Sequence, residues 1–141
     1  MIDYEKDRLK AYLDDLFDNF TEVKEEMEFK VKHQKKYYEK NSVYMSLEYC
    51  SKSDCIFCPH YFEWRQAIKI NTKEGKKNIG KRLGRKITHK ILKQLGKNNL
   101  YPVFKELEKE MIELQKKRDF YAKNIQKIQR ILRESQKESV K

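Results

Sequence analysis

The sequence has no long hydrophobic run. No apolar segment approaches the roughly 20 residues that a helix needs to cross a bilayer. The first five residues include two acids, Asp3 and Glu5, and no basic residue, and they lack the apolar stretch of a signal peptide. We therefore expect a cytoplasmic protein that has no membrane partner.

Hydrophobic residues are scarce overall, forming 38% of the chain against 39% charged residues. This balance argues against a compact globule built around one large core. Regularly spaced Leu, Ile, Phe and Tyr are nevertheless too frequent for the class of disordered proteins. The composition fits a protein of long helices or coiled coils better.

Catalytic motifs are also missing. None of the three histidines has a nucleophile at a recognisable spacing, and no glycine-rich loop could hold a phosphate. We therefore expect that the protein is not an enzyme.

Acidic residues nearly disappear from the middle of the chain. Residues 65–97 contain 12 lysines and arginines but one acid, Glu74. A solvated face usually mixes both signs of charge, so this segment predicts a polyanionic partner. The predicted phosphate-binding residues are Arg65, Lys69, Lys73, Lys76, Lys77, Lys81, Arg82, Arg85, Lys86, Lys90, Lys93 and Lys97.

Two segments have the three-and-four spacing of a coiled-coil helix. The first, from Asp3 to Lys40, contains no glycine or proline, and the second starts near Leu100 with Arg118 as its one polar seam position. The first seam is Leu9, Leu13, Leu16, Phe20, Val23, Met27 and Val31. The second seam is Leu100, Phe104, Leu107, Met111, Leu114, Arg118, Tyr121, Ile125, Ile128 and Leu132.

The residues between these segments favour β structure. We predict strands at 43–49, 61–70 and 76–83, a turn at 71–75, and a short helix from Arg85 to Gly96. The predicted fold is mainly α with a small β head (α+β). Residues 1–41 and 98–141 form an antiparallel coiled-coil hairpin. At the tip of this hairpin, residues 42–97 form a zinc-pinned head of a β-hairpin or three strands, with a short helix. The alternative is that the helices pair between two chains and give a homodimer.

The three cysteines lie close together in a pattern that is typical of a metal site. Cys50, Cys55, Cys58 and His60 form a C-x4-C-x2-C-x-H motif. Zinc prefers four thiolate and imidazole ligands in a structural site. Since a head of about 40 residues is too small to be stable by burial alone, we expect structural zinc at these four residues.

Other roles of the cysteines stay open. They could be small apolar core residues, a redox pair, or ligands of an iron–sulfur cluster, although most such clusters use four cysteines. His33 and His89 are substitutes for His60 as the fourth ligand.

At this motif the chain resembles an uncharacterised group of small prokaryotic and phage-associated proteins. In that group a helix and a strand ending in Cys precede a Cys-rich loop and a His-Gly-Pro-Tyr-Trp-type motif, and a basic hairpin and a helix follow. The resemblance covers residues 42–117 and rests on Tyr49-Cys50, Cys55, Cys58, His60, the aromatic run 61–64 and Gly75-Lys76-Lys77. Here His60 is followed by Tyr61 instead of Gly-Pro, and the last two cysteines are one residue further apart. The resemblance implies the architecture and the metal site, and no activity.

The basic segment predicts a nucleic-acid-binding function. Tyr61 and Trp64 lie beside it and could stack on bases, with a place in the core as the alternative. We expect a nucleoid-associated protein that binds duplex DNA with little sequence preference, ahead of structured RNA or the ribosome. The competing interpretation is a coiled-coil adaptor in which the head docks onto a protein.

Overall fold

The computed structural model describes residues 1–38 and 43–139 of the chain. The predicted end of the first helix, at residues 40–41, lies outside these residues. In the described part of the chain, no helix combines the length and the apolar character that a membrane span requires.

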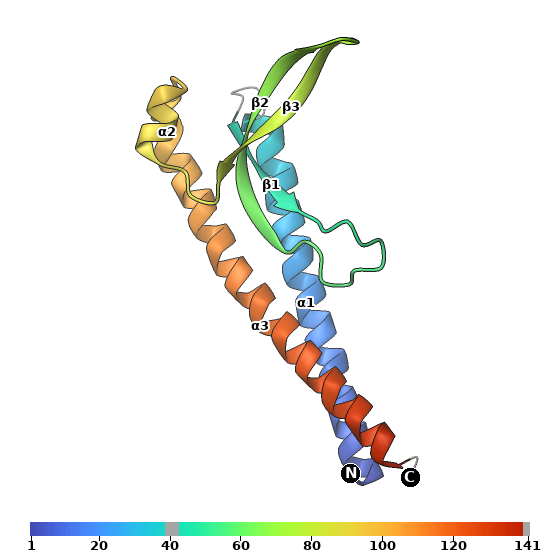
Figure 1. The fold of residues 1–141 in the computed structure, drawn as a ribbon. Helices are drawn as coiled ribbons and strands as arrows, with labels where there is room; N and C mark the ends of the chain where they lie inside the picture. Colours follow the sequence, from blue (N-terminus) through green and yellow to red (C-terminus); the bar gives the residue numbers. More distant parts are fainter. Residues whose placement is uncertain (39–42, 140–141) are drawn as a thin grey trace.

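Two long helices form the body of the molecule. Helix α1 spans Asp3–Tyr38 and helix α3 spans Tyr101–Ser139, so each is more than 50 Å long at about 1.5 Å per residue. Figure 1 shows them side by side and running in opposite directions, with both ends of the chain at the same end of the molecule.

Both predicted seams face the interior of the molecule, where their apolar residues belong to two hydrophobic clusters, one between the helices and one shared with the sheet. Every seam residue is buried or half-buried, and Met27, Phe104, Met111 and Ile125 are fully buried. The predicted helical periodicity is thus confirmed. The supercoil of a regular coiled coil stays a prediction.

The predicted strands form one antiparallel sheet in the order β1-β2-β3. Strand β1 spans Val43–Glu48, β2 spans Tyr61–Thr72 and β3 spans Gly75–Gly84. The β2–β3 turn needs a residue with positive φ, which Gly75 supplies at 118°. The mixed helix and sheet content confirms the α+β class.

One face of the sheet packs on the helix pair. Trp64 is fully buried, with its ring centroid 5.0 Å from that of Phe104 on α3. The side chain of Gln34 on α1 both donates to the Met45 carbonyl (2.9 Å) and accepts from the Met45 amide (3.3 Å). These bonds satisfy the backbone groups of Met45 on the edge strand β1 and attach the sheet to α1.

The predicted short helix is shorter than expected. Helix α2 spans His89–Gln94, and Thr88 caps it by accepting a hydrogen bond from the Ile91 amide. Residues 85–87 lie outside the helix, and the Ile87 amide donates to the buried Glu108 carboxylate (2.6 Å) instead of to a helical carbonyl. A 3-10 turn, η2 (Asn98–Leu100), then leads into α3.

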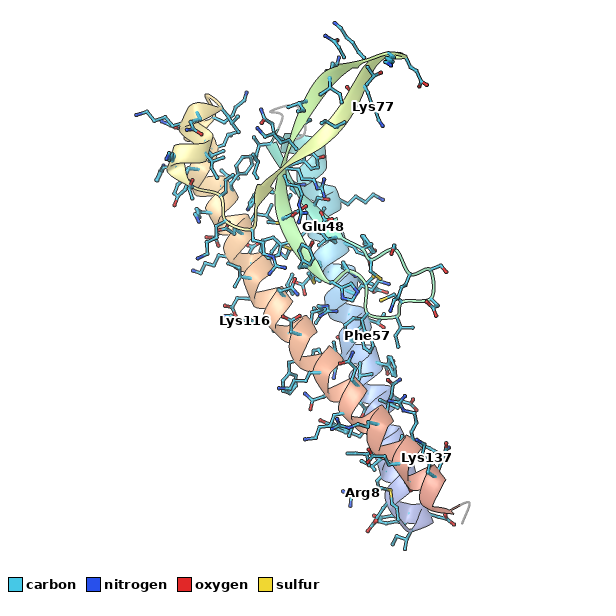
Figure 2. All side chains as sticks on the ribbon, viewed as in Figure 1. Arg8, Glu48, Phe57, Lys77, Lys116 and Lys137 are labelled. Carbon is cyan, nitrogen blue, oxygen red and sulfur yellow. The ribbon has the colours of Figure 1, made fainter. Side chains whose placement is uncertain are left out.

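The cysteine loop lies elsewhere than we predicted. We expected it in the head at the tip of the helix hairpin, together with the basic residues. Figure 1 shows that the loop between β1 and β2 lies beside the helices, at the opposite end of β2 from the β2–β3 turn. Phe57 in this loop makes an edge-to-face contact with Phe20 of α1 (5.8 Å between centroids), and Figure 2 shows its position. The prediction of a metal-pinned tip is wrong because this loop docks on the helix pair.

Candidate metal centre and nucleic-acid interface

The structure brings Cys50, Cys55, Cys58 and His60 together. Their ligand atoms all lie within 4.8 Å of one another. The Cys50 and Cys58 sulfurs are 3.4 Å apart, and the Cys55 sulfur is 3.3 Å from His60 Nε2. Tetrahedral zinc with bonds of 2.0–2.3 Å has ligand–ligand edges of about 3.3–3.8 Å. The four predicted residues could therefore hold a metal ion.

The histidines considered as substitutes are not part of this cluster. His33 stacks on Phe29 along α1, with 5.8 Å between ring centroids. His89 stacks on Tyr101 at the start of α3, with 3.4 Å between ring centroids. Of the three histidines, His60 is the one that the described structure places beside the cysteines.

Two of the thiols differ in proton affinity. Hydrogen bonds, first with the Phe57 backbone and then with Cys50, lower the pKa of Cys55 to about 6. Burial raises the pKa of Cys58 to about 11. Since a metal binds thiolates, Cys55 offers a charged sulfur at neutral pH, whereas Cys58 must lose its proton when a cation binds.

Arg118, the one polar residue of the α3 seam, attaches the cysteine loop to the helix. Its Nε donates to the Pro59 carbonyl (3.0 Å), and its Nη2 donates to the Phe57 carbonyl (2.8 Å). The guanidinium also lies 5.7 Å from the ring centre of Phe20 and pairs with Asp119 (2.7 Å). Arg118 thus satisfies two backbone carbonyls of the loop, at Phe57 and Pro59, and holds the loop on α3.

The contact between Arg118 and His60 bears on the fourth ligand. Arg118 Nη2 lies 3.2 Å from His60 Nδ1. A guanidinium can only donate, so this contact requires an unprotonated Nδ1. A neutral histidine that binds a metal through Nε2 carries its proton on Nδ1. Ligation by His60 through Nε2 would therefore require Arg118 to release this nitrogen while keeping its bonds to the loop carbonyls.

We expect Arg118→Ala to weaken metal binding about 10- to 100-fold, the range typical of outer-shell residues. The loop would lose two hydrogen bonds that hold it in position for the ion. Competition with a chromogenic chelator measures the metal affinity. Lys117→Ala, which removes an exposed charge from the same helix, is the control, and equal affinities for the two variants would contradict this role.

The basic residues lie at the other end of the sheet. Within the described residues, β1 pairs with β2 as far as Gln66, and residues 67–72 and 75–80 pair only with each other. This overhang is roughly 20 Å long at about 3.3 Å per residue, and Figure 1 shows it projecting from the body. The hairpin lysines, of which Figure 2 labels Lys77, are Lys69, Lys73, Lys76, Lys77 and Lys81.

A second basic element projects at the same end of the molecule. Helix α2 and its flanks carry Lys86, Lys90, Lys93 and Lys97, and Figure 1 shows α2 beside the start of α3, apart from the hairpin. All of these lysines are exposed except Lys97, which is half-buried. Within the described residues, neither they nor the hairpin lysines have a protein partner for their charge. Their ammonium groups are available to an external anion.

Two of the predicted phosphate-binding arginines are engaged within the protein. Arg65 pairs with Glu48 (2.9 Å) and Glu63 (2.7 Å), and Arg82 pairs with Glu63 (2.8 Å). Burial alone would raise the pKa of Glu63, but the hydrogen bond from Arg82 and the charges of both arginines lower it. Arg65 also donates to the Gly80 carbonyl (3.0 Å), so its main role is to hold the sheet together.

The two predicted base-stacking residues have different surroundings. Trp64 cannot stack on a base, because it is fully buried and its Nε1 donates to Glu108 (3.1 Å). This correction favours the alternative that Trp64 belongs to the core. Tyr61 is half-buried and carries the guanidinium of Arg85 over its ring at 4.2 Å. Stacking by Tyr61 stays a prediction.

Sequence reasoning missed the roles of Glu108 and Arg118. The signal for Arg118 was present, since a charged residue in an apolar seam needs a buried partner. Glu108 lies one position after the seam residue Leu107 and looks like a surface acid, so no local signal marks its buried acceptor role.

No protein-family model matches the chain, and no curated protein or solved structure shows significant similarity to it. The resemblance noted from the cysteine motif therefore stays a prediction.

Proposed function

We propose that this protein binds nucleic acid through its basic end and has no enzymatic activity. The observation that carries the proposal is that the hairpin and α2 lie at the same end of the molecule and that their lysines have no protein partner in the described chain. Clustered lysines attract phosphates and release condensed counterions on binding. The acid Glu74 at the turn offsets little of this charge.

The proposed partner is duplex DNA. A two-stranded ribbon fits the major groove of B-DNA, which is about 12 Å wide and 8.5 Å deep, and the 20 Å overhang exceeds that depth. The major groove of duplex RNA is too deep and narrow for side chains to read. Lysines of α2 would contact the phosphates that flank the groove.

The proposed ion at the cysteine cluster is structural zinc. Three thiolates and one imidazole are a typical closed zinc set, and the ligand atoms already lie within 4.8 Å of one another. A zinc ion there would close the β1–β2 loop against the helices and fix the base of β2. The hairpin at the other end of β2 would then project from a rigid support.

The test is a salt titration of binding to a labelled 20-base-pair duplex. We expect Lys73→Gln/Lys77→Gln/Lys81→Gln to weaken binding at least tenfold and to reduce the salt slope by about one for each lysine that contacts a phosphate. The matched control is Lys117→Gln/Lys123→Gln/Lys127→Gln, which removes the same charge from exposed positions of α3.

Equal loss of affinity in both triple variants would contradict a localised interface. Absence of binding to DNA and RNA at low salt would overturn the proposed function and favour the protein-docking adaptor. Tighter binding to structured RNA than to duplex DNA would move the assignment to RNA.

A further inference from the structure

One face of the projecting hairpin carries two lysines and two asparagines in alternation. Lys69 is paired with Asn78, and Asn71 with Lys76. Paired residues, and residues two apart on one strand, share a face of a sheet. Because the register is regular beyond the shift at Trp64/Arg65, these four residues form one group, which we call the Lys–Asn quartet.

The opposite face of the hairpin has another composition. Ile68 is paired with Ile79, and Ile70 with Lys77. The hairpin therefore has one face of amides and ammonium groups and one largely aliphatic face. Attraction of phosphates alone does not explain the amides, since asparagine is uncharged and is disfavoured in strands.

Formation of the turn does not explain the asparagines either. The side-chain hydrogen bond at the turn is made by Thr72, whose hydroxyl donates to the Gly75 carbonyl (2.7 Å). Asn71 and Asn78 are exposed, and in the described residues their side chains have no hydrogen-bond partner. Their donors and acceptors are free for a ligand.

The chemistry of the quartet matches the edges of bases. An asparagine amide can bind adenine N6 and N7 together, and a lysine can bind guanine O6 and N7 in the major groove. The two cross-strand pairs are separated by two residues along the strand, or about 6.6 Å. Two base-pair steps of about 3.4 Å cover nearly the same distance.

We propose that the Lys–Asn quartet reads base edges in the major groove and gives the protein a sequence preference. The inference rests on the proposed binding of duplex DNA by the hairpin, and it departs from the expectation of sequence-blind binding. The preferred sites would contain adjacent A·T and G·C pairs, because amides and ammonium groups alternate within the quartet.

The experiment selects bound duplexes from a random 20-base-pair library with the full-length protein at physiological salt. We then expect about 10- to 100-fold tighter binding of an enriched sequence than of its scrambled version. In Asn71→Ala/Asn78→Ala this ratio should fall below about threefold, while the affinity for the scrambled duplex and its salt slope stay unchanged, because backbone contacts carry no sequence information. Both asparagines are exposed, so the melting temperature should not change.

Asn19→Ala/Asn99→Ala is the matched control, with two exposed asparagines outside the hairpin. It should keep the preference of the parent protein. The inference is overturned if no sequence is enriched, or if the hairpin variant keeps the full preference. Salt-sensitive binding without preference would remove this inference and leave the proposed function, whereas absence of duplex binding would remove both.

Discussion

If the cysteine cluster holds the zinc ion that we propose, its removal with a chelator is expected to lower the melting temperature by about 10–15 °C. This shift corresponds to a loss of roughly 4 kcal/mol in the free energy of unfolding for a chain of this size. The physical reason is that a structural zinc site contributes its binding free energy directly to folding. The loop between β1 and β2 has little apolar surface to replace it, apart from Phe57 against Phe20.

Cys58→Ser should have the same effect without a chelator. Cys58 is the buried member of the cluster, with its sulfur 3.4 Å from that of Cys50, and serine is a poor zinc ligand. We expect elemental analysis to give one zinc per chain for the parent protein and none for this variant. Ser51→Ala and Ser53→Ala, both in the exposed part of the same loop, should keep the zinc and the melting temperature.

Three results would revise the proposed metal site. Full zinc content in Cys58→Ser would show that the ion binds elsewhere. A melting temperature that does not respond to the chelator would show that the cysteine loop folds without an ion. Iron together with visible absorption would replace zinc by an iron–sulfur cluster.

Glu108→Ala is expected to destabilise the fold by about 3–5 kcal/mol. The side chain of Glu108 is 4% exposed, and its Oε1 accepts from the Trp64 indole (3.1 Å) and the Ile87 amide (2.6 Å). Its Oε2 pairs with Lys105 (2.7 Å). Each buried donor left without a partner costs about 1–3 kcal/mol, and the deleted carboxylate leaves a cavity between sheet and helix. Urea denaturation measures the loss.

Two further variants separate the contribution of the hydrogen-bond acceptor from that of the ion pair and of the charge alone. Glu108→Gln keeps an oxygen for Trp64 and Ile87 and loses only the ion pair, so we expect a loss of about 1–2 kcal/mol. Glu106→Ala removes an exposed carboxylate from the same helix and should change the stability by less than about 0.5 kcal/mol. Equal stability of Glu108→Ala and Glu106→Ala would show that Glu108 does not join β2 and the residues before α2 to helix α3.

Local patterns were sufficient to predict the elements. The seams of α1 and α3 repeat every three and four residues, and this repeat reports directly on which side of a helix is apolar. The β2–β3 hairpin was also predictable from local sequence, because β-branched and aromatic residues favour strands and Gly75 favours the turn. The four metal-site residues are close in sequence, so the loop that joins them could bring them together without distant parts of the chain.

Long-range packing decided the rest, because the partners lie far apart in sequence. Phe57 and Arg118 are 61 residues apart, so the sequence does not indicate the hydrogen bond between them that docks the cysteine loop beside the helices. Trp64 is an aromatic residue beside a basic segment, so its sequence context suggests base stacking. Its hydrogen bond to Glu108 and its contact with the ring of Phe104 show that it belongs to the core.

The sequence by itself determined where helices, strands and positive charge occur, because periodicity, turn residues and charge are local properties. The tertiary structure decided which charges are free. It pairs Arg65 with Glu48 and Glu63, pairs Arg82 with Glu63, and leaves the hairpin lysines without a partner in the described chain. It also set the register that places Asn71 and Asn78 beside lysines, since cross-strand pairing depends on how two strands meet and not on either strand alone.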